Sequence, residues 1–418
     1  MTLDASPTRS DASPTRGDAG LPTAPLYLDT AAAAPVRREA LEAAWPYLTG
    51  SFGNPSSHHE VGRASAEALL AARRSVARVL GMRSTDIVFT SGGTEANNLG
   101  IIGMALGAVP EDPTATSGGD GVVGAPRRHL VISPLDHEAV LASADFLRRR
   151  HGFTVTEVAV DSSGTVTPAA LSRALRNDTA VVSLGYANNE IGTIADVPAL
   201  AAVAHSAGAR FHTDAVQAAG WLPLSGLGAD ALSLAGHKVG APKGIGAAAI
   251  RSRIPLEPLI HGGGQESGRR SGTENVALAV AFATALELAE AERLEAADRV
   301  SAIRDDFIAE VLASISGVFL TGSPDSRTPN HASFCFSRTS GEAMLLELER
   351  LGVIASSGSA CAAGSDEPSH VLTALGVDAE VAKTSVRFTF PSSITAAQGR
   401  AAAGAVIEAA SRLALAYT

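Results

Sequence analysis

The chain is organised around one stretch, Asp230-Ala-Leu-Ser-Leu-Ala-Gly-His237-Lys238-Val-Gly-Ala-Pro-Lys-Gly-Ile-Gly246. An apolar run typical of a buried β-strand stops at Gly236, and a histidine and a lysine follow before a turn rich in Gly and Pro. A lysine at the end of a buried strand has to pair with an anion, extend to water, lose its charge or react with a carbonyl group. A surface lysine after a strand is the simpler interpretation. Whether Lys238 instead belongs to a ligand site depends on which residues stand at the other strand ends of the chain.

The composition indicates a protein large enough for about two domains. The chain has 418 residues, of which 45% are hydrophobic, and a formal net charge of −10. An acidic chain without a long basic run offers no surface suited to a nucleic-acid backbone. The two cysteines, Cys335 and Cys361, exclude a disulfide scaffold and a metal site made of cysteines alone, and we expect no metal site.

The hydrophobic pattern favours a cytoplasmic protein without a membrane segment. The longest apolar helix-like run, Val276 to Leu286, is far short of the ~20 residues that a membrane span requires. The first residues lack the basic start and the apolar block of a secretory signal. We therefore expect neither a membrane nor a nucleic acid among the partners.

Four segments can be distinguished along the chain. Residues 1–25 contain the hexapeptide Asp-Ala-Ser-Pro-Thr-Arg twice and are predicted to be a disordered tail. Residues 26–286 are predicted to form a large domain, in which residues 109–128 are a mobile surface insertion. In residues 287–418 a long charged helix is followed by a mixture of strands and helices, which predicts a smaller α+β domain.

Strand-like and helix-like segments alternate over more than 150 residues of the large domain. This alternation predicts an α/β fold with a mostly parallel sheet covered by helices on both faces. In such sheets, ligands bind at the carboxyl ends of the strands. Polar residues that suit a ligand site stand at these predicted ends: Thr94, His137, Asn189, Asp214 and Lys238.

These residues together suit pyridoxal 5′-phosphate (PLP), which needs a Schiff-base lysine, a phosphate cradle and an acid for its ring nitrogen. Lys238 is the lysine, and Asp214 is the acid at a strand end. The Gly-rich turn before Thr94 directs backbone N–H groups and a helix dipole at one point, which suits a phosphate. We assign His237 as a further phosphate donor and His137 as the group over the ring. The donor to the ring oxygen is Asn189 or Gln217.

The two cysteines stand in different surroundings. Cys335 alternates with Phe334 and Phe336 in a predicted strand, so it is interpreted as a small core residue. Cys361 follows Ser356-Ser-Gly-Ser-Ala, a segment predicted to be a flexible, exposed loop. A thiol there contributes little to packing and suits a nucleophile that has to travel to its target.

In combination, these motifs resemble the NifS/IscS-type cysteine desulfurases of the class-V aminotransferase superfamily. The resemblance runs from about residue 26 to beyond residue 390. The segments that carry it are Tyr27-Leu-Asp, Phe52-Gly-Asn-Pro-Ser-Ser, Phe89-Thr-Ser-Gly-Gly-Thr-Glu-Ala-Asn-Asn98, Asn188-Asn-Glu-Ile-Gly192, His212-Thr-Asp-Ala-Val-Gln217, Gly236-His-Lys238, His261-Gly-Gly-Gly-Gln, Arg270-Ser-Gly-Thr273 and Ser356-Ser-Gly-Ser-Ala-Cys361.

The resemblance implies the fold of a fold-type I PLP-dependent transferase, with a mostly parallel seven-stranded sheet, and a homodimer. It implies conversion of L-cysteine to L-alanine, with a persulfide left on Cys361 for a sulfur acceptor such as an Fe–S scaffold protein. A transient contact between Cys361 and an Fe–S cluster is compatible with that role.

By position, the resemblance also implies roles for single residues. Lys238 is the Schiff-base lysine and proton shuttle, Asp214 pairs with the ring nitrogen, and His137 stacks on the ring. Arg387, helped by Asn189, binds the substrate carboxylate, which is a bidentate task that suits arginine. The phosphate is held by Gly93, Thr94 and His237, joined by Thr273 of the partner subunit, and the ring oxygen is served by Asn189 and Gln217.

Two departures from the family pattern concern the site. Ala235 stands where many members carry a serine that binds the phosphate, and Ser233 need not replace it. Thr30-Ala-Ala-Ala-Ala stands where Asn-Ala-Ala-Thr-Thr is usual, which changes local hydrogen bonding.

Three alternatives remain open from the sequence. A selenocysteine lyase would use the same fold, and an aminotransferase-like enzyme would need a 2-oxo acid acceptor but not Cys361. A degenerate sulfur-relay scaffold would be colourless when purified. The sulfur acceptor is open as well, because Fe–S assembly, tRNA thiolation and DNA phosphorothioation would all use these residues.

Overall fold

The computed structural model describes residues 25–109, 127–337, 339–358 and 367–416. Residues 1–24 of the predicted disordered tail, nearly all of the predicted insertion at 109–128, and Cys361 lie outside these residues.

A seven-stranded sheet forms the centre of the large unit, in the order β2-β8-β7-β6-β5-β3-β4. The five strands from β7 to β4 are mutually parallel, whereas β8 is antiparallel to both of its neighbours. This confirms the predicted α/β class and mostly parallel sheet. The strands are β2 (Ile87–Thr90), β3 (His129–Ile132), β4 (Thr154–Glu157), β5 (Thr179–Ser183), β6 (Arg210–Asp214), β7 (Ala231–Ala235) and β8 (Gly246–Ile250).

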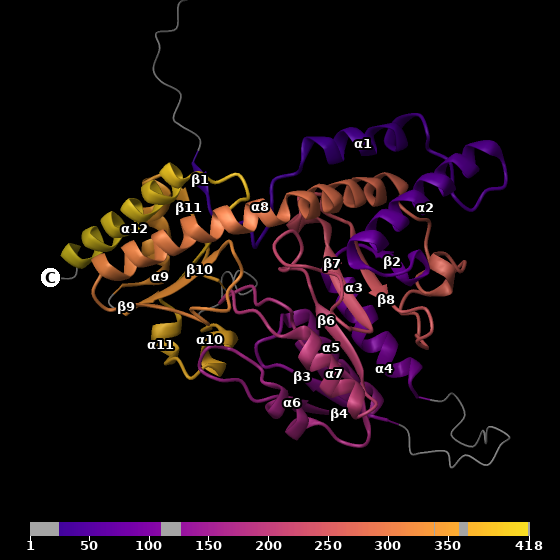
Figure 1. Ribbon diagram of the computed structural model, residues 1–418, viewed down its shortest axis with the longest axis horizontal. Coiled ribbons are helices and arrows are strands. Elements are labelled where there is room, and N and C mark those ends of the chain that lie inside the picture. The colour runs from indigo at the N-terminus through magenta and orange to yellow at the C-terminus, as the bar shows by residue number, and fades with distance from the viewer. Residues whose placement is uncertain (1–24, 110–126, 338, 359–366, 417–418) are drawn as a thin grey trace, which may run out of the picture.

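Helices cover both faces of this sheet (Figure 1). Successive residues of a strand point to opposite faces, so Val131 lies in one hydrophobic cluster while Leu130 and Ile132 lie in another. Where both faces are covered, in β5, β7 and β8, the strands are buried throughout and mostly apolar, whereas β4 at the edge is partly exposed. The helical segments are α2 (Glu60–Leu80), α3 (Gly93–Asn98), a π-helix (Leu99–Gly103), α4 (Met104–Gly107), α5 (Glu138–His151), α6 (Pro168–Ala174) and α7 (Val197–Ser206).

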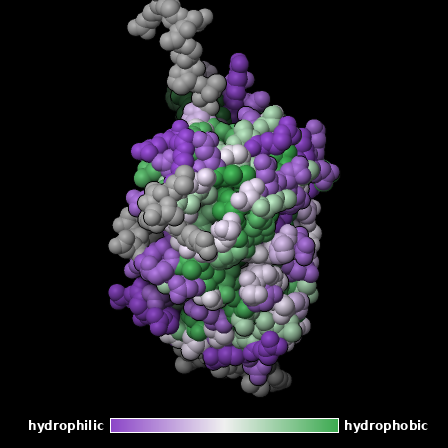
Figure 2. All heavy atoms as spheres, turned by 90° about the vertical axis from the view of Figure 1, so that its left-hand side faces the viewer, coloured by the Kyte–Doolittle hydropathy of each residue, from purple (hydrophilic) through white to green (hydrophobic). Residues whose placement is uncertain are grey.

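A smaller antiparallel sheet, ordered β12-β10-β9, forms the second unit. Its core includes a group of phenylalanines, in which Phe307 makes an edge contact with Phe388 at a centroid distance of 5.2 Å. When the molecule is viewed from the left-hand side of Figure 1, where the small unit lies, apolar side chains form a band down the middle of the surface (Figure 2). The elements are β9 (Val318–Leu320), β10 (His331–Phe336), β12 (Ser385–Thr389), α9 (Gly341–Arg350), α10 (His370–Ala374), α11 (Ala379–Ala382) and α12 (Ala396–Ala416).

One long helix, α8 (Val276–Ser314), runs along both units (Figure 1). Its first half packs in the large core and its second half in the small core. The apolar run and the charged helix of the sequence are thus one element, and the predicted boundary at residue 286 falls inside it. The helix α1 (Arg38–Thr49) packs against α8.

The start of the described chain also differs from the predicted division. The strand β1 (Leu26–Tyr27) pairs in parallel with β11 (Val353–Ile354), and Leu28 is fully buried in the small core. From the sequence, these first residues were expected in the large domain. A two-residue strand carries no periodic signal, so only its distant partner reveals where it packs.

Candidate active site

A cavity of about 520 Å³ opens at the carboxyl ends of the parallel strands, and residues of both units line it. Its lining includes most of the residues that the sequence singled out: Gly93, Thr94, His137, Asn189, Asp214, Gln217, His237, Lys238 and Arg387. Thr273 was predicted to contribute to the site of the partner subunit, and it does not line the cavity of its own chain. Cys361 lies outside the described residues.

Lys238 ends the short 3₁₀ turn Gly236–Lys238 that follows β7. The turn needs glycine first, because a Cβ on Gly236 would lie 2.8 Å from Ile245 Cγ2. The Lys238 ammonium donates to the carbonyl oxygen of Ala31, and to that of Ala32 at 2.9 Å. The alanine-rich segment that departs from the family pattern therefore contributes hydrogen bonds to the site through its backbone oxygens.

Asp214 is the last residue of β6, and its carboxylate is held at both oxygens. Asn97 Nδ2 donates to Oδ2 at 2.6 Å, and the Val216 N–H donates to Oδ1 at 2.9 Å. Gln217 lies one turn further on and donates from Nε2 to the Ala31 carbonyl at 3.1 Å. The carboxylate and Lys238 line the same cavity, so an anionic and a cationic group face one space.

The predicted phosphate cradle lies where α3 begins, at Gly93 and Thr94. A Cβ on Gly93 would lie 2.9 Å from Val216 Cγ2 and 3.3 Å from the Ala235 Cβ, so only glycine fits there without a shift. His237 lies beside it, and its pKa is lowered to about 4, first by burial and then by the charges of Lys238 and Lys243. A neutral imidazole therefore lines the cavity at neutral pH.

Ser233 does not replace the hydroxyl that is missing at Ala235. Its Oγ lies 2.9 Å from His212 Nε2, and the other ring nitrogen of His212 lies 2.8 Å from Ser183 Oγ. The three side chains cross β5, β6 and β7 and are fully buried. Ser233 is thus occupied within the sheet, and Ala235 leaves the cradle with one hydroxyl fewer, as the sequence analysis expected.

His137 caps the N-terminus of α5, with its Nδ1 accepting from the Ala139 N–H at 3.0 Å. The preceding residue, Asp136, is buried at the cavity wall and accepts from the N–H groups of Ser133 and Gly185 at 2.9 and 2.8 Å. Burial, and to a lesser degree the charge of Asp214, raises the pKa of Asp136 to about 7. Asp136 thereby joins the loops that follow β3 and β5, and fixes the segment that carries His137.

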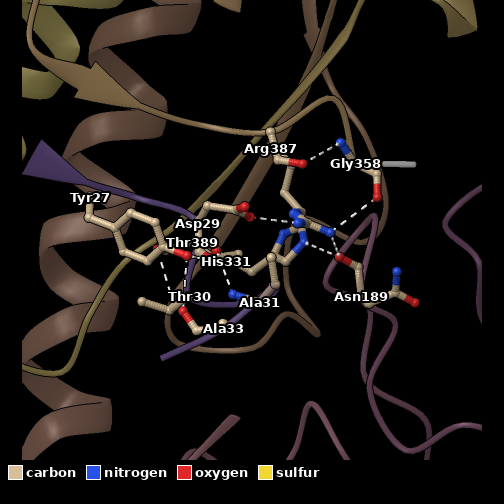
Figure 3. A network of polar contacts seen from close by, with 12 residues as sticks. Tyr27, Asp29, Thr30, Ala31, Ala33, Asn189, His331, Gly358, Arg387 and Thr389 are labelled. Carbon is tan, nitrogen blue, oxygen red and sulfur yellow. Dashed lines mark hydrogen bonds and ion pairs between the residues drawn. The ribbon is translucent and has the colours of Figure 1, made fainter. Parts of the chain in front are cut away.

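Arg387, in β12 of the small unit, also lines the cavity and lies in a network of polar contacts (Figure 3). Its Nη2 donates to Asp29 Oδ1 at 2.7 Å, and its Nη1 donates to the carbonyl oxygens of Asn189 at 2.8 Å and Gly358 at 3.1 Å. Its Nε is buried and has no hydrogen-bond partner among the described residues. Asn189 presents its backbone oxygen to Arg387 and directs its amide away (Figure 3).

Comparisons with known proteins identify the family of the chain. The family model described as aminotransferase class-V matches residues 26–398. A cysteine desulfurase IscS of Dictyoglomus turgidum is 44% identical over 366 residues, which cover 87% of this chain and 89% of that protein. The chain belongs to the cysteine desulfurase family.

Two solved structures extend the likeness to three dimensions. A NifS-like protein superposes with a TM-score of 0.83 at 32% identity, covering 93% of this chain and all of the other. A second structure, described as SspA in complex with cysteine, has a TM-score of 0.74 at 32% identity and covers 88% of this chain and 99% of the other. These matches confirm the predicted family and fold.

Enzymes of this family are generally PLP-dependent, and the cavity of this cysteine desulfurase fits that cofactor. It combines a lysine amine, a fixed carboxylate at Asp214 and a neutral imidazole at His237. The space in front of Gly93 is one that a side chain would fill. Among the described residues, no group of three or more His, Cys, Asp or Glu side chains could hold a metal ion.

Sequence reasoning missed three residues of this desulfurase site. Asn97 lies one turn after Gly93 on the same helix, so its helical spacing could have indicated it. Asp29 belongs to the quoted segment Tyr27-Leu-Asp, but its partner Arg387 is more than 350 positions away. Asp136 precedes His137, and nothing local distinguishes it from a surface carboxylate.

No helix in the described part of the chain is both long and apolar enough to span a bilayer.

The buried His212 gives a testable dependence of stability on pH. Burial lowers its pKa from the ordinary value of 6.5 to about 3. Between these values the unfolded chain binds a proton at this ring and the folded chain does not, so the free energy of unfolding falls as the pH decreases. The contribution of His212 to this slope is about 1.4 kcal/mol per pH unit.

His212→Gln removes this titration while retaining one donor and one acceptor. In denaturant titrations between pH 6 and 4.5, we expect the variant to lose less stability per pH unit than the wild type. The exposed His58, changed to Gln, is the control and should leave the slope unchanged. An unchanged slope in His212→Gln would show that the ring is protonated in the folded protein.

Proposed function

We propose that this cysteine desulfurase binds PLP through Lys238, converts L-cysteine to L-alanine, and leaves the sulfur as a persulfide on Cys361. One observation carries the proposal. Lys238, Asp214 and the start of α3 in the large unit line the same cavity as Arg387 in β12 of the small unit. The large unit thus offers groups for a cofactor and the small unit an arginine for a carboxylate, which supports an amino acid as the substrate.

PLP, when bound, withdraws electrons from the Cα of an amino acid and so weakens the bonds next to it. Of the chain's own residues, Lys238 would attach the cofactor and move a proton. Asp214 would face the ring nitrogen, and His137 the ring. Gly93, Thr94 and His237 would hold the phosphate, with Thr273 contributed to the site by the second subunit. Asn189 and Gln217 would lie near the ring oxygen.

Arg387 would bind the carboxylate of L-cysteine. Arginine binds carboxylates through two parallel N–H donors, which fixes orientation as well as charge. In the structure three of its N–H donors are already used by Asp29, Asn189 and Gly358. The substrate carboxylate would therefore use the remaining donors or displace one of these partners. The similar structure described as a complex with cysteine supports L-cysteine as the substrate.

Cys361 would receive the sulfur. Its thiolate attacks the sulfur of L-cysteine, so that an S–S bond forms while the C–S bond of the substrate breaks. The electron pair of the broken bond stays on carbon, which takes up a proton and becomes the methyl group of L-alanine. Cys335 cannot take this role, because it is fully buried and burial raises its pKa to about 12.

The proposed partners are a second copy of the chain and a sulfur acceptor. Leu41, Trp45 and Leu48 lie at helical spacing on α1 and are 50%, 65% and 59% exposed. An apolar row of this size supports a covering subunit. The acceptor would be an Fe–S scaffold protein or a thiolation system. The proposed location is the cytoplasm.

The activity is tested by incubating the purified PLP-loaded protein with L-cysteine and a thiol reductant. We expect L-alanine and sulfide in equal amounts without any 2-oxo acid. Amino-group transfer that occurs only with an added 2-oxo acid would instead identify an aminotransferase. Full activity on L-selenocysteine in Cys361→Ser, with none on L-cysteine in the wild type, would identify a selenocysteine lyase.

A further inference from the structure

We propose that Asn97 is the residue that positions the carboxylate of Asp214 for the cofactor. The inference rests on the proposed function, in which Asp214 faces the ring nitrogen of PLP. Asn97 Nδ2 donates to Asp214 Oδ2 at 2.6 Å, which is the only side-chain hydrogen bond that this carboxylate makes among the described residues. The other oxygen accepts from the backbone at Val216.

Asn97 is itself buried beside the cavity. The residue is 1% exposed and lines the cavity, and its Oδ1 is buried without a hydrogen-bond partner among the described residues. A buried amide oxygen without a partner costs free energy. This cost is compatible with an amide whose other end has a necessary donor role at Asp214.

The packing of one helix face on one strand face sets the distance between the two side chains. Asn97 and Gly100 are three positions apart, on one face of the helical segment that starts at Gly93. Asp214 and His212 are two positions apart, on one face of β6. A Cβ on Gly100 would lie 2.6 Å from His212 Cδ2, so the helix packs this closely on the His212 ring only because residue 100 has no side chain.

The donor role has a directional consequence for Asp214. A carboxylate held at one oxygen only can rotate about its Cβ–Cγ bond, whereas the Asn97 and Val216 donors together fix its plane. Each oxygen keeps a second lone pair that can face the cavity. Asn97 thereby acts on the cofactor through Asp214, without touching the reacting atoms.

The experiment measures the PLP dissociation constant of apoprotein by absorbance titration. For Asn97→Ala we expect it to rise about tenfold, since a hydrogen bond to a charged group is lost. Asn98→Ala is the matched control, because Asn98 donates to the Thr94 carbonyl from the more exposed side of the same helix, and its constant should not change. Asn97→Ser retains a hydroxyl donor and should fall between Asn97→Ala and the wild type.

A double-mutant cycle separates this positioning role from a general effect on folding. In the Asp214→Asn background, Asn97→Ala should no longer change the dissociation constant, because the positioned carboxylate is gone. An equal loss in both backgrounds would overturn the proposal, as would unchanged PLP binding in Asn97→Ala. A wild-type protein that binds no PLP would instead refute the proposed function. Should Asn97→Ala not fold, Asn97→Ser in both backgrounds gives the same test.

Discussion

Lys238→Ala is expected to lower the release of L-alanine from L-cysteine by at least about 10³-fold. The reason is that the Lys238 amine is proposed both to attach the cofactor and to move the proton. The lysine lies at the end of β7, and its ammonium is held by the carbonyl oxygens of Ala31 and Ala32. These oxygens fix the side chain at the cavity wall without neutralising it. Among the described residues that line the cavity, Lys238 is the only lysine. An alanine at this position therefore leaves no amine there to attach the cofactor.

The measurement is the visible absorption of PLP-loaded protein together with L-alanine release. Lys238→Ala should lose the band of the covalently bound cofactor, and Lys238→Arg should not restore it although it restores the charge. Lys383→Ala is the control, because Lys383 forms an exposed ion pair with Glu380 at 2.8 Å and lies outside the cavity. A Lys238→Ala protein with the wild-type band and turnover would show that another lysine carries the cofactor.

Arg387→Ala is expected to raise the KM for L-cysteine by at least about 10²-fold. Truncating one partner of a buried, hydrogen-bonded charge pair typically costs several kcal/mol. The side chain of Arg387 is 3% exposed, and removing it also leaves the Asp29 carboxylate without its cation. The uncompensated charge of Asp29 would then repel the substrate carboxylate, which adds to the loss.

Cysteamine, which is L-cysteine without the carboxylate, makes this test specific. The wild type should bind L-cysteine far more tightly than cysteamine, and Arg387→Ala should bind the two with similar affinity, as measured by their spectral changes at the cofactor. Arg387→Lys keeps the charge without the planar fork and should recover only part of the preference. If Arg387→Ala retains the wild-type preference for L-cysteine, the carboxylate binds elsewhere.

The sequence was sufficient for the parts of the site that follow from strand ends. Strand and helix alternation predicted the parallel sheet, and the carboxyl ends of parallel strands must share one edge. His137, Asp214 and Lys238 could therefore be brought together without coordinates. The family resemblance added Arg387, which stands in a strand of the other unit and has no local signature of a ligand site.

The rest depended on contacts between distant segments. Lys238 is held by backbone oxygens of Ala31 and Ala32, and a carbonyl group has no sequence signature. Asp29 pairs with Arg387 only because β1 joins the small unit through β11. The long helix α8 could not be read as one element, because its apolar first half and charged second half pack against different cores.

The central claim is that the sulfur of L-cysteine moves to Cys361 while L-alanine is released. The most direct measurement is a single turnover with ³⁵S-labelled L-cysteine without reductant, followed by peptide mapping by mass spectrometry. The account predicts one L-alanine per site and one labelled persulfide, located on the peptide that contains Cys361 and absent in Cys361→Ser. L-alanine released with no label on that peptide, or undiminished turnover in Cys361→Ser, would contradict it.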